Sequence, residues 1–218
     1  MSNAALPSLG PLGPAVDASA SIIADLISKG WAVVDDFVPG EWAADLLNEQ
    51  LLQFRRGAFR FAGIGRDDAY QLDSQTRGDQ ILWLDQGSAL SAQRRYLAKL
   101  EELRLAVNRD LFLGLYELDT HAAVYQPGSF YQRHLDGFRK GNLRTLTAIL
   151  YLNPCWHAHD GGALRLYLEA SPNGEFLDVL PVSGRLVAFL SESFYHEVLE
   201  TRRTRSSITS WFSRRSLS

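Results

Sequence analysis

Apolar residues recur at helical spacing in three segments of the first half of the chain. The first follows Asp17 or Ser19, either of which can cap a helix, and ends before Gly30, which can adopt the left-handed conformation of a helix stop. The second begins at Pro39 and runs to about Phe54, and the third spans 91 to about 113. The predicted apolar faces consist of Ile22, Ile23, Leu26 and Ile27, then Trp42, Leu46, Leu47 and Leu51, then Tyr96, Leu97, Leu100, Leu103 and Val107.

The rest of the apolar pattern consists of short runs with the two-residue period of β-strands. Two runs lie between the predicted helices, at 31–37 and 81–84, and the others follow one another from Leu118 onward. These later runs are 121–125, 130–134, 143–152, 163–168, 186–190 and 206–212. Asp160-Gly161-Gly162 predicts a hairpin turn between two of them, because its glycines accept positive φ. We therefore predict an α+β domain that is mainly an antiparallel sandwich or barrel, with the helices packed on one outer face.

Two segments carry neither pattern. Residues 1–16 are rich in Ala, Pro, Gly and Ser, and we expect a flexible tail there. Residues 56–80 are rich in Gly, Arg and Asp, and a loop of this length is a candidate substrate cover. The remaining chain fits one domain over 17–218, with helical support over 17–113 and a β core over about 117–213.

The composition narrows the function classes. An apolar fraction of 46% and a charged fraction of 22% are ordinary for a globular protein, and no apolar run is long enough to span a bilayer. A formal charge of -3 offers no overall attraction to nucleic acid, although five arginines lie between 202 and 215. Cys155 is the only cysteine, which excludes an intrachain disulfide. We expect a cytoplasmic protein that binds neither nucleic acid nor membrane.

The candidate chemistry begins with His134 and Asp136. Two residues apart in an extended segment, their side chains point to the same face. His196 lies 62 positions later, where a neighbouring strand can bring a second imidazole to that face. Two imidazoles and one carboxylate on one side of an octahedral ion leave three open positions, which is the ligand set of non-haem Fe(II) oxygenases. By itself, His-x-Asp is a weak signal.

A second group strengthens the prediction. Arg205 follows His196 by nine residues, and the two-residue period places Arg205, Thr209 and Trp211 on one face of a strand. A guanidinium there can hold a carboxylate with two parallel hydrogen bonds, as the distal end of 2-oxoglutarate requires.

These motifs together resemble the prolyl hydroxylase branch of the 2-oxoglutarate oxygenases, which includes the enzymes acting on hypoxia-inducible factor. The chain is similar above all to their bacterial counterpart that modifies elongation factor Tu. The matching stretches are 76–83, 125–128, 131–136, 144–153, 161–164 and 196–211. The sequence departs from the family's Tyr-Pro-Gly by inserting Gln126 after Tyr125.

The resemblance implies a double-stranded β-helix of the jelly-roll or cupin type and a role for each matched residue. His134, Asp136 and His196 would bind iron. Arg205 and Tyr151 would hold the distal carboxylate of 2-oxoglutarate, with Tyr125 near the metal and Thr209 on the same wall. Arg144 and Trp211 would border the pocket of the substrate proline.

It also implies cofactors and partners. Fe(II), 2-oxoglutarate and dioxygen, with ascorbate as an accessory, would hydroxylate a prolyl residue of a protein at C4 and release succinate and carbon dioxide. Elongation factor Tu is the expected substrate, and we expect a monomer. Two alternatives remain open: an oxygenase acting on a small molecule or another side chain, and an idle metal-binding barrel.

Other residues have plainer interpretations. We expect His157 and His159, which form a rival cluster with Asp160, to be exposed at a turn, and His121 to be structural. We expect Trp83 to lie in the core because it ends an apolar strand. Tyr125 and Tyr151 could instead be ordinary strand aromatics with hydroxyls at the surface.

Overall fold

The computed structural model describes residues 18–63, 73, 75–136, 143–171 and 174–215. The predicted tail over 1–16, the capping residue Asp17 and much of the predicted loop therefore lie outside the described residues. The helices are α1 (Ala18–Lys29), α2 (Gly40–Arg55) and α3 (Ser91–Leu111), close to the predicted bounds. Within the described ranges, no helix combines the length and apolar character that a bilayer crossing needs.

The strands of the described residues form two antiparallel sheets. The larger has the order β1-β9-β6-β11-β4-β3-β2 and the smaller the order β5-β10-β7-β8. The larger sheet contains β1 (Trp31–Val34), β2 (Arg60–Phe61), β3 (Gln80–Leu84), β4 (Leu115–Tyr125), β6 (Arg144–Tyr151), β9 (Leu186–Leu190) and β11 (Arg205–Arg214). The smaller contains β5 (Tyr131–His134), β7 (Leu164–Tyr167), β8 (Phe176–Val179) and β10 (His196–Val198).

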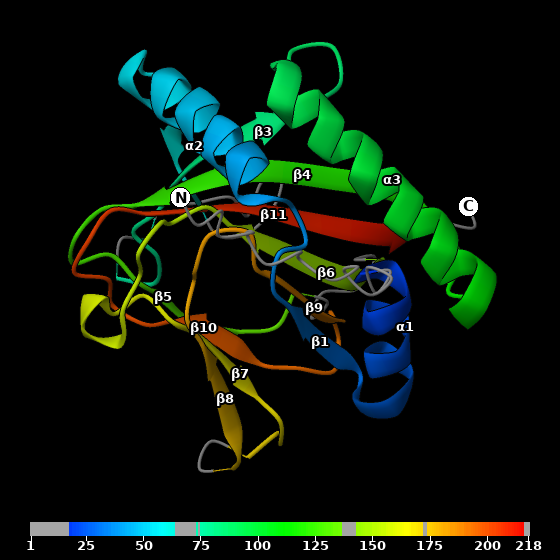
Figure 1. Cartoon of the computed structure of the whole chain (residues 1–218). Helices are drawn as coiled ribbons and strands as arrows, with labels where there is room; N and C mark the ends of the chain where they lie inside the picture. Colours follow the sequence, from blue (N-terminus) through cyan, green and yellow to red (C-terminus); the bar gives the residue numbers. More distant parts are fainter. Residues whose placement is uncertain (1–17, 64–72, 74, 137–142, 172–173, 216–218) are drawn as a thin grey trace, which may run out of the picture.

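The helices cover the outer face of the larger sheet, and the smaller sheet lies on the opposite side (Figure 1). Strand residues alternate between the two faces, so even-numbered residues of β4 such as Ala122 and Val124 pack in the core beneath the helices. Odd-numbered neighbours such as Ala123 and Tyr125 belong to a second apolar cluster between the sheets. This arrangement is the double-stranded β-helix that the sequence predicted, and it leaves the inner face of the larger sheet opposite the smaller one.

Two sequence expectations about apolar positions are wrong. Trp83 is 53% exposed rather than in the core, because it points to the inner face of β3 close to the edge of the larger sheet. Ile27 is 67% exposed at the border of the α1 face, while the rest of that face is buried.

The expected hairpin at Asp160-Gly161-Gly162 is also wrong. The two glycines do have positive φ, +68° and +66°, but β6 and β7 belong to different sheets, so the segment crosses from one sheet to the other. Gly161 forms an isolated bridge with Thr201, and a Cβ there would lie 2.3 Å from the carbonyl oxygen of Glu200. The absence of a side chain at these glycines therefore allows two chain segments to approach each other closely.

Candidate active site

Two imidazoles meet because of strand register. His196 on β10 is paired with His134 on β5, so the side chains lie side by side on the face that the smaller sheet turns towards the larger. Their ring centroids are 4.2 Å apart. The register of two short strands thus brings together residues that are 62 positions apart in the sequence.

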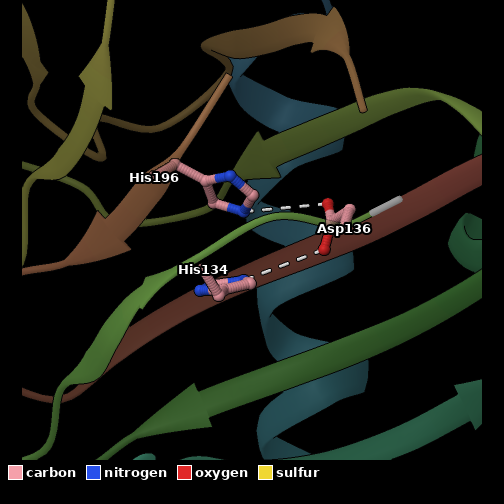
Figure 2. A group of neighbouring side chains, drawn as sticks. All are labelled: His134, Asp136 and His196. Carbon is pink, nitrogen blue, oxygen red and sulfur yellow. Dashed lines mark ion pairs between the residues drawn. The ribbon is translucent and has the colours of Figure 1, made fainter. Parts of the chain in front are cut away.

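Asp136 lies just beyond the end of β5 and completes the cluster (Figure 2). Its Oδ1 is 3.7 Å from His134 Nε2, and its Oδ2 is 3.7 Å from His196 Nε2. One ligand atom from each residue lies within 4.8 Å of the others. Two imidazole nitrogens and a carboxylate oxygen at this spacing could hold a divalent metal ion with positions left open.

Each imidazole is oriented by its own strand. His134 Nδ1 lies 2.8 Å from the carbonyl oxygen of Gln132, and His196 Nδ1 lies 3.2 Å from that of Phe194. A backbone carbonyl accepts from an N–H, so Nδ1 carries the proton and Nε2 keeps its lone pair for a metal. Burial, aided by the neighbouring His196, lowers the pKa of His134 to about 3, which keeps that ring neutral.

Asp136 is held by two donors from the larger sheet. Thr147 Oγ1 and Trp211 Nε1 each donate to Oδ2 at 2.8 Å, and the Thr147 hydroxyl is also 2.8 Å from Ser191 Oγ. Burial raises the pKa of Asp136, but the two imidazoles and the Trp211 hydrogen bond outweigh it and hold this pKa below its usual value. The carboxylate is therefore ionised and fixed in direction.

A stack of side chains supports His134 from outside the cluster. The Tyr131 ring lies 3.7 Å from the His134 ring at an interplanar angle of 18°. The Arg77 guanidinium lies 4.2 Å from the Tyr131 ring and forms two hydrogen bonds with Asp79, at 2.7 and 2.6 Å. Sequence reasoning gave Tyr131 and Arg77 no role, although both lie in the stretches that carry the family resemblance.

A cationic position lies further along the inner face of β11. Arg205 is 1% exposed and stands opposite Tyr125 in the β11–β4 register. Its guanidinium carbon lies 4.9 Å from the Tyr125 ring and 5.1 Å from the Tyr151 ring. Its Nε donates to the carbonyl of Gly162 at 2.9 Å and its Nη1 to Ser207 Oγ at 3.2 Å. Both tyrosines are buried, which contradicts the alternative of hydroxyls at the surface.

The surroundings of Arg205 fit a carboxylate ligand. Among the described residues, no aspartate or glutamate forms an ion pair with it, which is costly for a buried charge. The buried hydroxyl of Tyr151 likewise forms no well-aligned hydrogen bond with any of the residues that the structure describes. Burial raises the pKa of Tyr151 to about 12 despite the opposing charge of Arg205, so the hydroxyl keeps its proton to donate. A dicarboxylate such as 2-oxoglutarate would satisfy both groups.

The other predicted residues line the same face. Arg144 stacks on Trp211 at 3.6 Å, so these two form one wall beside Asp136. Thr209 lies between Arg205 and Trp211 on β11 with the same orientation. His157 and His159 are exposed, as expected, and Asp160 pairs with Arg203 rather than with a metal cluster.

Comparison with known proteins agrees with this arrangement. The family described as "2OG-Fe(II) oxygenase superfamily" matches residues 120–213. Human prolyl hydroxylase EGLN3 is 31% identical over 199 residues, which cover 88% of this chain and 81% of the relative. The hypoxia-inducible factor prolyl hydroxylase of Caenorhabditis elegans is 30% identical over 88% of this chain and 27% of its own length.

Two solved structures are similar to this chain in both fold and sequence. A Pseudomonas putida prolyl-4-hydroxylase is 42% identical with a TM-score of 0.81, covering 91% of this chain and 100% of that one. A Trichoplax adhaerens prolyl hydroxylase, solved with a peptide fragment of the hypoxia-inducible factor oxygen degradation domain, is 25% identical with a TM-score of 0.79. The alignment with the Trichoplax protein covers 89% of this chain and 88% of that protein.

Proposed function

Because this chain belongs to the prolyl hydroxylase family of Fe(II)- and 2-oxoglutarate-dependent oxygenases, we propose that it hydroxylates C4 of a prolyl residue in a protein substrate. Elongation factor Tu is the substrate we propose, on the resemblance to its bacterial modifying enzyme. The observation that carries the proposal is the pairing of a His134, Asp136 and His196 cluster with a buried arginine that has no acidic partner among the described residues.

We assign the iron to His134, Asp136 and His196, and the distal carboxylate of 2-oxoglutarate to Arg205 and Tyr151. Tyr125 and Thr209 complete the cofactor wall. When bound, Fe(II) with 2-oxoglutarate and dioxygen supplies the oxidising power; the protein residues hold and orient the reactants. The Nδ1 hydrogen bonds keep both imidazoles in the metal-binding tautomer, and Thr147 and Trp211 fix the carboxylate.

The substrate end is assigned to Arg144 and Trp211. Trp211, which donates to Asp136 and carries the Arg144 guanidinium against its ring, places an aromatic surface beside the cluster, which suits an uncharged proline ring. A protein substrate is supported by the Trichoplax relative, whose structure contains a bound peptide fragment. The name of the Pseudomonas relative supports hydroxylation at C4.

We further propose one oxygenase domain over 17–218, with helical support over 17–113 and a β core over about 117–213. The pairing of β1 with β9 and of β3 with β4 supports it, because the larger sheet combines strands from both parts. A monomer in the cytoplasm, with ascorbate as an accessory reductant, completes the proposal; the single cysteine fits a reducing compartment.

The test supplies the enzyme anaerobically with Fe(II), 2-oxoglutarate and a proline-containing peptide from the switch loop of elongation factor Tu, and then admits air. Mass spectrometry of the peptide and a succinate assay are read together. One added oxygen per succinate supports both reaction and substrate, since the second oxygen atom of dioxygen enters succinate. Succinate without modified peptide rejects this substrate and favours a small molecule or another side chain.

Variants connect the reaction to the site. We expect His134→Ala and Asp136→Ala to lower turnover at least about a hundredfold, because each removes a metal-binding group. His159→Ala is the matched control, since that imidazole is exposed and outside the cluster. Wild-type turnover in either ligand variant contradicts the assignment.

A further inference from the structure

His121 occupies a position that the proposed function does not use. It lies on the inner face of β4, paired with Trp83 of β3 and Thr209 of β11. Its side chain therefore points between the sheets, on the same side as the cofactor wall. Although it is polar, His121 is only 4% exposed.

The imidazole of His121 lacks the hydrogen bonds that a buried polar group normally has. Nδ1 is enclosed without a partner, and within the described part of the chain no hydrogen bond reaches Nε2 either. Its neighbours are the rings of Trp83, at 5.2 Å, and Trp211, at 5.0 Å. Buried polar groups left unpaired are uncommon and call for an explanation, such as a ligand that binds there.

The charge of the ring is settled by its surroundings. Burial lowers the pKa of His121 to about 3; the charges of Arg77 and Arg144 act in the same direction, and those of Asp79 and Asp136 oppose it. The neutral ring has one donor and one acceptor. An unpaired acceptor is better tolerated than an unpaired donor, so the enclosed Nδ1 is the acceptor and Nε2 carries the proton.

His121, Trp83 and Trp211 form one cluster of three rings, since the Trp83 and Trp211 rings also lie 6.2 Å apart. Trp211 donates to Asp136, and Trp83 is 53% exposed. A substrate that reaches Asp136 by way of these two tryptophans therefore comes next to His121. A peptide bond before proline offers a carbonyl oxygen but no N–H, so a single donor beside aromatic rings matches its chemistry.

We propose that His121 is a substrate-positioning and specificity residue, whose Nε2–H donates a hydrogen bond to a backbone carbonyl of the substrate next to the target proline, with Trp83 packing on the flanking peptide. This proposal rests on the proposed prolyl hydroxylation. It assigns to His121 a ligand contact rather than the structural role expected from the sequence.

The test compares wild type with His121→Phe, which keeps an aromatic ring without the donor, and His121→Gln, whose amide can place an N–H near the position of Nε2. His159→Phe is the matched control at an exposed histidine. The probes are the switch-loop peptide of elongation factor Tu and the hypoxia-inducible factor peptide fragment. We expect the peptide KM to rise about tenfold in His121→Phe, as for the loss of one hydrogen bond, and to recover largely in His121→Gln.

Two further readings separate a contact from a packing role. The dissociation constant for 2-oxoglutarate should change much less than the peptide KM, because Arg205 and not His121 is assigned to that ligand. In the Zn(II)- and 2-oxoglutarate-loaded wild type, which does not turn over, the 15N signal of His121 Nε2 should shift when the peptide is added.

The outcomes are distinguishable. If the wild type hydroxylates a peptide but His121→Phe has the same peptide KM, or the His121 signal does not shift, the proposal for His121 is overturned and the function stands. If the wild type consumes 2-oxoglutarate without hydroxylating either peptide, the proposed substrate class fails, and the role of His121 fails with it.

Discussion

Truncation of Arg205 to alanine should weaken 2-oxoglutarate binding more than any other single change away from the metal cluster. Arg205 is fully buried, and no carboxylate of the described residues forms an ion pair with it. The geometry of its Nε and Nη1 bonds to Gly162 and Ser207 fixes the side chain before any ligand arrives. The site is therefore preorganised, so little binding energy is lost in ordering it.

The magnitude follows from the bonds that would be lost. Hydrogen bonds between charged groups contribute about 1.5–3 kcal/mol each, and a two-pronged guanidinium–carboxylate contact has two of them. A loss of about 3–5 kcal/mol corresponds to a rise of roughly 10²–10⁴-fold in the dissociation constant for 2-oxoglutarate. Arg205→Lys keeps the charge but not the planar fork, and we expect about a tenfold rise.

The assay measures the KM for 2-oxoglutarate by succinate formation, and binding by the ligand-dependent rise in melting temperature of the Zn(II)-loaded protein. Wild type should strongly prefer 2-oxoglutarate to 2-oxopentanoate, which lacks the distal carboxylate, and Arg205→Ala should discriminate little between them. Arg165→Ala is the matched control, because Arg165 pairs with Asp178 near the surface. A KM within threefold of wild type, or unchanged discrimination in Arg205→Ala, would refute the assignment of Arg205 to this carboxylate.

Three further predictions test the surroundings of the site. In the folded protein His121 stays neutral, with its pKa lowered to about 3, whereas in the unfolded chain its side chain takes up a proton near pH 6.5. Between pH 6.5 and 5 the unfolded state therefore binds more protons than the folded state. The free energy of unfolding of the metal-free protein should fall over this range, by up to about 1.4 kcal/mol per pH unit from this group. Urea titrations at several pH values should show that the free energy of unfolding of His121→Gln depends less on pH than that of the wild type. The same pH dependence in both would contradict the expectation. Gly161→Ala should lower the free energy of unfolding by about 2–3 kcal/mol, because the new Cβ would lie 2.3 Å from the carbonyl oxygen of Glu200. Gly57→Ala is the control and should cost about 1 kcal/mol, because Gly57 also has a positive φ, +72°, but no atom lies within 4 Å of its Cβ position. Equal losses in chemical denaturation would be inconsistent with the close approach at Gly161. Tyr131→Leu should weaken Zn(II) binding about tenfold in calorimetry and Tyr131→Phe should not, since it is the ring that stacks on His134, an imidazole that we assign to the metal. Similar affinities in both variants would show that the stack has no such role.

Periodicity predicted the helices well because one face of each packs on the larger sheet. In α3, Tyr96, Leu100 and Val107 are fully buried, as their helical spacing required. The same reasoning missed β8 and β10. β8 begins with two adjacent apolar residues, of which Phe176 is 47% exposed, so its apolar and polar residues do not alternate. β10 has three residues, which are too few to show a period.

The residues of the site could be predicted from the sequence, whereas the contacts between them depend on the tertiary structure. The sequence by itself determined the donor types, the two-residue spacing of His134 and Asp136, and, through family resemblance, the positions of His196 and Arg205. Only the fold decided that β10 pairs with β5 so that His196 meets His134, because register between distant strands depends on the whole sheet. It also decided that Trp211 donates to Asp136 and that Trp83 is exposed beside a buried His121. Strand alternation specifies which face a side chain takes, whereas its partners across the barrel depend on strands that are far away in the sequence.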